Sequence, residues 1–156
     1  MVQAMTPTAT RVEQHTSPEI NERIRKEADQ EVQWLEGASA EEITARIEEL
    51  EKEWDVERLL QMNSSVLVLS GVILGHKVNP KWFLLSAAVY TFFFQHAVQG
   101  WCPPIPIFRR LGIRTQKEID REKYALKVLR GDFQQVPEMG TDLKERVRAV
   151  LRAVDA

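Results

Sequence analysis

Two side chains of this 156-residue chain have the chemistry of a reactive site, Cys102 and His96. Cys102 is followed by Arg109 and Arg110, and nearby cations favour the thiolate, the reactive form of cysteine. The simpler interpretation is that Cys102, which precedes Pro103, is a small buried packing residue. Cys102 is therefore a candidate catalytic thiol, with a structural role as the preferred alternative.

His96 lies in an uncharged stretch, where an ionisable group is costly if the stretch is a membrane helix. Its hydrogen-bond partner is expected to be Gln95, Gln99 or a polar group on another helix. On an ideal helix His96 and Cys102 point about 120° apart, which is too far for one local metal site. A heme or metal site near His96 would need ligands from a second chain, and a neutral histidine hydrogen-bonded between helices is the simpler interpretation.

The elements that must position these side chains are two apolar stretches, residues 59–75 and 82–108, which contain no Lys, Arg, Asp or Glu. A bilayer core requires about 20 apolar helical residues, so we expect transmembrane spans at about 59–78 and 81–102. A buried helical pair in a soluble domain is the alternative. The short connection makes the spans antiparallel neighbours. The predicted fold is an all-α membrane protein, with an antiparallel two-helix transmembrane hairpin and amphipathic cytoplasmic helices on both sides.

Aromatic and cationic residues mark the ends of these spans. Trp82 and Trp101 border the second span, and Arg109 and Arg110 follow it, where interface anchors belong. The connection 76–81 carries only two cations, whereas the outer flanks carry more, and this asymmetry places both termini in the cytoplasm. The cations of the outer flanks are Arg46, Lys52, Arg58, Arg109, Arg110, Arg114 and Lys117.

Gly71 and Gly75 form a small-xxx-small pattern in the first span. Glycine lets two helix backbones approach closely, which drives helix association in lipid. The pattern predicts a packing seam, with either the second span or another chain as its partner.

The flanks divide at residues that start and stop helices. Residues 1–16 are expected to be a flexible N-terminal tail, and residues 17–58 to form cytoplasmic amphipathic helices, one of which begins at a capping box of Ser39 and Glu42. The transmembrane hairpin takes up residues 59–108. Residues 109–156 are expected to form cytoplasmic interfacial and C-terminal helices, and Thr115 with Glu118 makes a second capping box.

Several short motifs in and after the hairpin resemble a known family. They are Asn-Pro-Lys-Trp at 79–82, Gly-Trp-Cys-Pro at 100–103 and Arg-Arg-Leu-Gly-Ile-Arg-Thr at 109–115, and they are similar to the signature of the YgaP-like inner-membrane domain family. The resemblance covers roughly residues 64–115 and implies a two-helix hairpin in the bacterial cytoplasmic (inner) membrane. Some members carry a rhodanese domain that transfers sulfur on a cysteine. The only cysteine here, Cys102, lies at the end of the hairpin, so the resemblance does not carry that activity over.

The net charge and the absence of known binding motifs argue against several classes of function. A net charge of -2 offers no basic excess for nucleic acid, and there is no Cys-His array or Gly-rich phosphate loop. We expect a protein that works by binding rather than catalysis: a structural or accessory subunit of a membrane complex, or a self-associating module. Its partners are then the lipid bilayer and other membrane subunits or itself, with no cofactor and no metal. The alternatives are a thiol-dependent sulfur or redox carrier through Cys102 and an inter-chain heme or metal site near His96.

Overall fold

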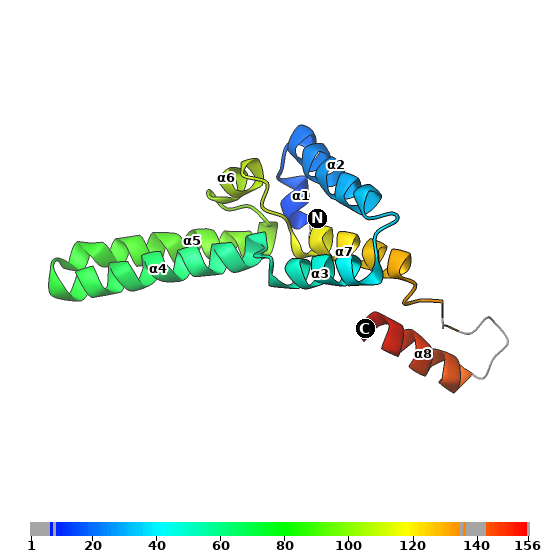
Figure 1. Ribbon diagram of the computed structural model, residues 1–156. Helices are drawn as coiled ribbons and strands as arrows, with labels where there is room; N and C mark the ends of the chain where they lie inside the picture. The colour runs from blue at the N-terminus through cyan, green and yellow to red at the C-terminus, as the bar shows by residue number, and fades with distance from the viewer. Residues whose placement is uncertain (1–6, 8, 135, 137–142, 156) are drawn as a thin grey trace, which may run out of the picture. The chain divides into compact units, whose positions relative to one another are not determined.

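The computed structural model describes residues 7, 9–134, 136 and 143–155, and every regular element in them is helical (Figure 1). The all-α prediction is confirmed for these residues. The chain divides into two compact units, one of residues 1–26 and 54–118 and the other of residues 27–53 and 119–156. The elements are α1 (Arg11–Gln14), α2 (Pro18–Trp34), α3 (Ala40–Lys52), α4 (Val56–Lys77), η1 (Pro80–Trp82), α5 (Phe83–Gln99), α6 (Ile105–Arg110), α7 (Gln116–Arg130) and α8 (Leu143–Asp155).

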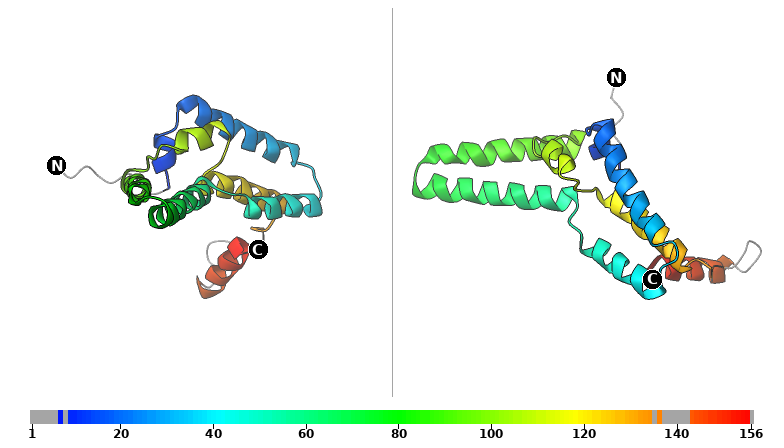
Figure 2. Two further views of the ribbon diagram at one scale, coloured as in Figure 1. Left: turned by 90° about the vertical axis from the view of Figure 1, so that its left-hand side faces the viewer. Right: turned by 45° about the horizontal axis from the view of Figure 1, so that its top comes forward.

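The first unit is built around α4 and α5, which run side by side in opposite directions as one helical hairpin (Figures 1 and 2). Asp55 caps α4 by accepting a hydrogen bond from the Arg58 N–H at 2.8 Å. Asn79 starts η1, which leads directly into α5. Gly100 ends α5 in the left-handed conformation, with φ of 81°. The sequence predicts that the second span ends at about residue 102. In the structure the helix ends at Gln99.

Only one stretch of the described residues contains a helix long and apolar enough to cross a membrane, Ala40–Lys77, which includes α4. The 17-residue α5 alone is not such a helix. Only 22% of the most apolar window in Ala40–Lys77 is buried. That low burial distinguishes it from the core helix of a soluble domain, which would be mostly buried.

The N-terminal segment differs from the flexible tail expected for residues 1–16. Residues 1–6 and 8 lie outside the described part, but Arg11–Gln14 form α1. Val12 packs in a core cluster with Val56, Leu60, Cys102 and Ile105. Burial of Val12 among side chains of the hairpin and α6 provides the apolar contact that fixes this segment.

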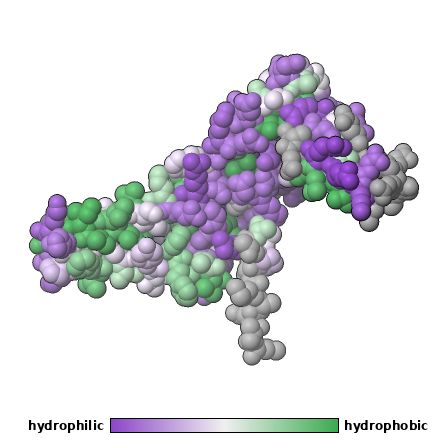
Figure 3. Space-filling view, turned by 90° about the horizontal axis from the view of Figure 1, so that it is seen from below, coloured by the Kyte–Doolittle hydropathy of each residue, from purple (hydrophilic) through white to green (hydrophobic). Residues whose placement is uncertain are grey.

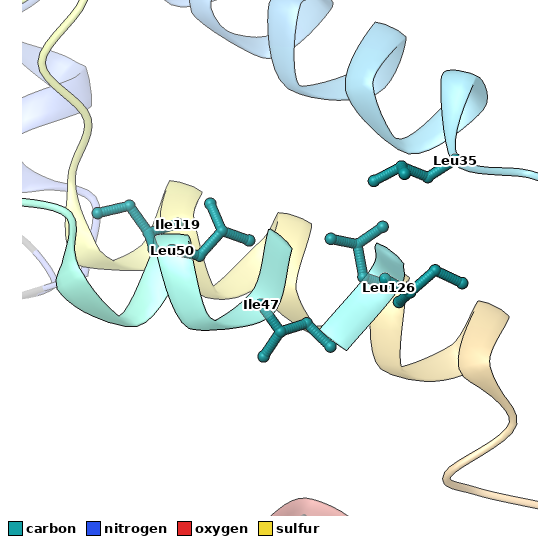
Figure 4. Close-up of a cluster of buried hydrophobic side chains, with 6 residues drawn as sticks. Leu35, Ile47, Leu50, Ile119 and Leu126 are labelled. Atoms are coloured by element: carbon teal, nitrogen blue, oxygen red, sulfur yellow. The ribbon is translucent and has the colours of Figure 1, made fainter. Parts of the chain in front are cut away.

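The second unit buries the apolar seam of α3. Ile43, Ile47 and Leu50 are packed with Leu35, Ile119 and Leu126 in one hydrophobic cluster (Figure 4). The seam thus contacts helices of its own chain. Ser39 and Glu42 form the predicted capping box, with both reciprocal hydrogen bonds present.

Candidate functional site

The hairpin carries a broad apolar surface. Large hydrophobic side chains remain exposed along both α4 and α5, and Figure 3 shows them gathered over the hairpin, with hydrophilic residues at its far end. Soluble monomers rarely expose contiguous apolar patches of this kind, and such patches mark protein or membrane contacts. The exposed side chains are Met62, Val66, Leu67, Leu69, Val72, Ile73, Phe83, Leu84, Tyr90, Phe92, Phe94 and Val98.

The two tryptophans predicted as interface anchors lie in different surroundings. Trp82, in η1 at the turn of the hairpin, is 43% exposed. Trp101 lies just beyond α5 and is half-buried, with its ring edge-on to Phe92 at 6.4 Å between centroids. Trp82 therefore presents its ring to the surroundings, whereas Trp101 packs mainly within the chain.

The predicted glycine seam lies between the two helices of the hairpin. A Cβ atom added to Gly71 would collide with Oγ of Ser86 and lie 3.1 Å from both the Ser86 nitrogen and the Trp82 carbonyl oxygen. At Gly75 it would lie 2.9 Å from the Phe83 ring. Ser86 also donates a hydrogen bond from Oγ to the Val68 carbonyl at 2.9 Å. Of the two partners left open by the sequence, these glycines contact the second helix of their own chain.

A partly buried polar network joins α1, α4 and α5 at the open end of the hairpin. His96 is only 2% exposed, and its Nε2 donates to the Glu57 carboxylate at 2.9 Å and 3.1 Å. Arg11 donates from Nη2 to Glu57 Oε1 at 2.9 Å. We call Arg11, Glu57 and His96 the base network. It supplies His96 with a partner on another helix, one of the possibilities that the sequence left open.

The base network holds Glu57 ionised. Glu57 is in the first turn of α4, before the uncharged stretch that starts at residue 59. Burial raises the pKa of Glu57, but the hydrogen bonds from His96 and Arg11 outweigh burial and lower that pKa to about 2. His15 adds a further link by donating from Nε2 to the Gln99 carbonyl oxygen at 2.9 Å. These contacts tie the N-terminal segment to the end of α5.

Cys102 lies three residues beyond the end of α5 and is 4% exposed. It packs with Val12, Val56, Leu60 and Ile105. Burial raises the pKa of the Cys102 thiol, which disfavours the thiolate at neutral pH. These surroundings match the packing interpretation of Cys102.

Arg109 differs from the exposed interface anchor that the sequence predicts. It is 0% exposed, and its guanidinium donates to both oxygens of Glu118, at 2.6 and 2.7 Å. The same group donates to the Ile113 carbonyl and to Asn21 Oδ1, each at 2.9 Å. Arg109 therefore holds α6 to the starts of α2 and α7, and only its neighbour Arg110 is exposed.

Glu118 completes this second buried site. Its carboxylate accepts from the Thr115 N–H at 2.8 Å, and its own N–H donates to Thr115 Oγ1, so the second capping box is present as predicted. Burial raises the pKa of Glu118, but the hydrogen bonds from Arg109 and Thr115 lower it overall.

Sequence reasoning missed Arg11, Asn21 and Glu57 as partners of the buried groups. Glu57 offers one usable signal, because an acid directly before an uncharged span can meet a polar group near the end of the next span. Arg11 and Asn21 offer none, since their partners lie 46 and 88 positions away in the sequence. In the described part of the chain, no group of three or more His, Cys, Asp or Glu side chains is placed to hold a metal ion.

Comparisons with protein-family models, with curated proteins and with solved structures found no match to this chain. The resemblance to the YgaP-like inner-membrane domain family therefore stays a prediction.

Proposed function

We propose that this chain is an integral protein of the bacterial inner membrane, anchored by the α4–α5 hairpin, and that it serves as a structural or accessory subunit. The observation that carries the proposal is the apolar surface exposed on both helices of the hairpin. In water such a surface would favour aggregation, whereas in lipid it is the ordinary exterior of a spanning helix.

The dimensions of the hairpin support two spans. Residues 59–77 of α4 have a helical length of about 28 Å, and η1 and α5 together, from Pro80 to Gln99, reach about 30 Å. As full helical lengths, both values are close to the hydrocarbon thickness of a bilayer, although the apolar part of the second helix, which ends before the His96 that pairs with Glu57, is shorter. The 3-residue η1 brings the second span to this length, although α5 alone has only 17 residues.

The charged side chains of the hairpin lie toward its two ends. Lys77 and Lys81 flank the turn, and the base network of Arg11, Glu57 and His96 lies at the opposite end. This distribution leaves the surface between them free of charged side chains. By the positive-inside rule, the proposed topology has the turn outside the cytoplasm and both termini in it.

The proposed role as a subunit is supported by the packing of the two glycines inside the hairpin. Gly71 and Gly75 pack within the chain, so the outer surfaces of α4 and α5 are available to lipid and to other membrane helices. The flanking helices supply further contacts for partners. The resemblance to the YgaP-like family is consistent with this location and size.

Topology is tested by labelling single cysteines in a Cys102→Ala background. We expect Val78→Cys, at the exposed turn, to react with an impermeant maleimide in intact cells, and Gln30→Cys, on exposed α2, to react only after permeabilisation. The opposite pattern would reverse the proposed topology. Recovery of the chain in the soluble fraction after an alkaline carbonate wash would reject the membrane proposal itself.

The subunit role is tested against a thiol carrier. We expect Cys102→Ala to preserve the membrane level of the protein and the partners recovered with it in mild detergent. Deletion of residues 119–156, which keeps the Glu118 partner of Arg109, should release those partners while the hairpin stays inserted. Loss of a cellular sulfur or redox phenotype in Cys102→Ala, with no effect of the deletion, would favour the carrier.

A further inference from the structure

The last helix, α8, exposes its larger apolar side chains and buries its smallest ones. Val147, Val150, Leu151 and Val154 are 37–56% exposed, whereas Ala149 and Ala153 are 8% and 6% exposed. A surface helix in a soluble unit ordinarily turns its branched apolar side chains toward the core. The arrangement in α8 therefore leaves an apolar stripe facing outward. We call Val147, Val150, Leu151 and Val154 the α8 stripe.

The α8 stripe is continuous along one side of the helix. Its members are spaced 3, 1 and 3 positions apart, which at about 100° per residue keeps them within an arc of roughly 100°. Exposed Lys144 and Arg148 follow along one border of this arc, at roughly 60° and 100° from Val147. Ala149 and Ala153 lie on the opposite side of the helix.

α8 contacts α7 of its own unit through a hydrogen bond near its last turn. Lys127, a buried residue of α7, donates from Nζ to the Val154 carbonyl oxygen at 2.7 Å. A cation at this position also interacts favourably with the negative end of the helix dipole. In this arrangement Ala149 and Ala153 face the unit, and the α8 stripe faces away from it.

From these observations we propose that the α8 stripe binds the anionic surface of the membrane, with its aliphatic side chains at the boundary between the lipid headgroups and the acyl chains. The proposal rests on the proposed membrane anchoring of the chain. An apolar stripe bordered by cations is typical of helices that lie in the plane of an anionic bilayer surface. Lys144, Arg146, Arg148 and Arg152 supply cations along the helix, against Glu145 and Asp155 as the acids.

A lipid surface fits the α8 stripe better than a protein partner does. A stable protein interface buries about 800 Å² on each side and involves about 20 or more residues of each partner. Four aliphatic side chains are far below that size, and none of them is an aromatic residue of the kind that dominates binding at protein interfaces. Because the proposed anchor and α8 belong to the same chain, lipid binding by α8 would be intramolecular, and a weak affinity is sufficient.

The test places a bimane fluorophore on single cysteines of the full-length Cys102→Ala protein in lipid nanodiscs that hold one copy each. The probe positions are Val150→Cys in the α8 stripe, Glu145→Cys on the polar side of α8, and Leu69→Cys on the exposed surface of α4. Quenching by brominated lipid reports contact with acyl chains. One copy per disc removes contact with a second copy as a source of burial.

We expect quenching at Val150→Cys and Leu69→Cys and none at Glu145→Cys, in discs of phosphatidylcholine with phosphatidylglycerol. Lys144→Gln with Arg148→Gln should lower the ratio of bound to free α8 about 25-fold, since one cation near an anionic surface contributes about five-fold. The matched control, Arg25→Gln with Lys52→Gln, removes the same charge from exposed positions outside α8 and should leave that ratio unchanged.

Two results separate this proposal from the membrane proposal. Quenching at Leu69→Cys without quenching at Val150→Cys would overturn lipid binding by α8 and keep the hairpin in the membrane. No quenching at Leu69→Cys would overturn the membrane proposal, and lipid binding by α8 with it. Protection of Val150→Cys from maleimide in native membranes, but not in nanodiscs, would assign the α8 stripe to a protein partner and would also overturn the proposal.

Discussion

Replacement of Arg109 by methionine should strongly destabilise the first unit. The guanidinium is fully buried and donates four hydrogen bonds, two to Glu118 and one each to Ile113 and Asn21. Methionine keeps much of the side-chain volume but leaves the Glu118 carboxylate with only its contacts to Thr115. Removal of one member of a buried ion pair costs about 3–5 kcal/mol, so we expect the free energy of unfolding to fall by that amount.

The assay is thermal unfolding of the detergent-solubilised protein, followed by circular dichroism. For a chain of this size each kcal/mol corresponds to roughly 2–4 °C, so Arg109→Met should lower the melting temperature by roughly 6–20 °C. Arg110→Met is the matched control, because Arg110 is the adjacent residue and is exposed. Its effect should stay within about 0.5 kcal/mol. Arg109→Lys should fall between them, since lysine keeps the charge but cannot form the two-pronged contact with Glu118.

A result in which Arg109→Met and Arg110→Met have equal, small effects would refute this reasoning. It would mean that both arginines are solvated, as the sequence alone predicts for a pair of interface anchors. A double-mutant cycle with Glu118→Gln separates the ion pair from general loss of packing, because a pair in direct contact gives a coupling free energy of about 0.5–3 kcal/mol.

Two further predictions concern the hairpin. Gly71→Ala should weaken the packing of α4 on α5 and reduce resistance to proteolysis, because its Cβ meets Ser86 backbone and side-chain atoms. Gly37→Ala is the control, because Gly37 has open space around it. Equal behaviour of the two variants would contradict the close packing of Gly71 on α5. Glu57→Gln should lower the melting temperature at neutral pH, and the difference from the wild type should shrink as the pH falls from about 4.5 toward about 2. The reason is that a carboxylate with a lowered folded-state pKa loses its stabilising contribution when it is protonated. A difference in melting temperature between Glu57→Gln and the wild type that is independent of pH would contradict the base network.

The starts of helices that carry a capping box were accessible from local sequence. Capping residues act on the backbone within three positions, so Ser39 with Glu42 and Thr115 with Glu118 could be identified without knowledge of the fold. Gly100 was not used in this way. Its left-handed conformation ends α5 at Gln99, three residues before the predicted end of the second span at about residue 102.

The buried polar sites were not accessible in the same way, because their partners are distant in the sequence. Arg109 and Arg110 are adjacent residues of the same type, yet one is fully buried and the other is exposed. Only the position of Glu118 and Asn21 around α6 distinguishes them. Arg11 was assigned to a tail for the same reason, since its partner Glu57 is 46 positions away.

The base network also changes how the length of the second span is judged. The uncharged stretch 82–108 suggests a long apolar helix, but His96 within it pairs with the ionised Glu57 at the start of α4. In the proposed membrane arrangement this pair marks the polar end of the hairpin, so the apolar part of the second span extends only from about Trp82 to Gln95. Its helical length is then about 21 Å, which is shorter than a typical hydrocarbon core of about 30 Å. A span of that length is accommodated by local thinning of the bilayer and by outward extension of Lys77 and Lys81 toward the headgroups. The position of charge in three dimensions, and not the count of uncharged residues, therefore sets the expected depth of the hairpin in the membrane.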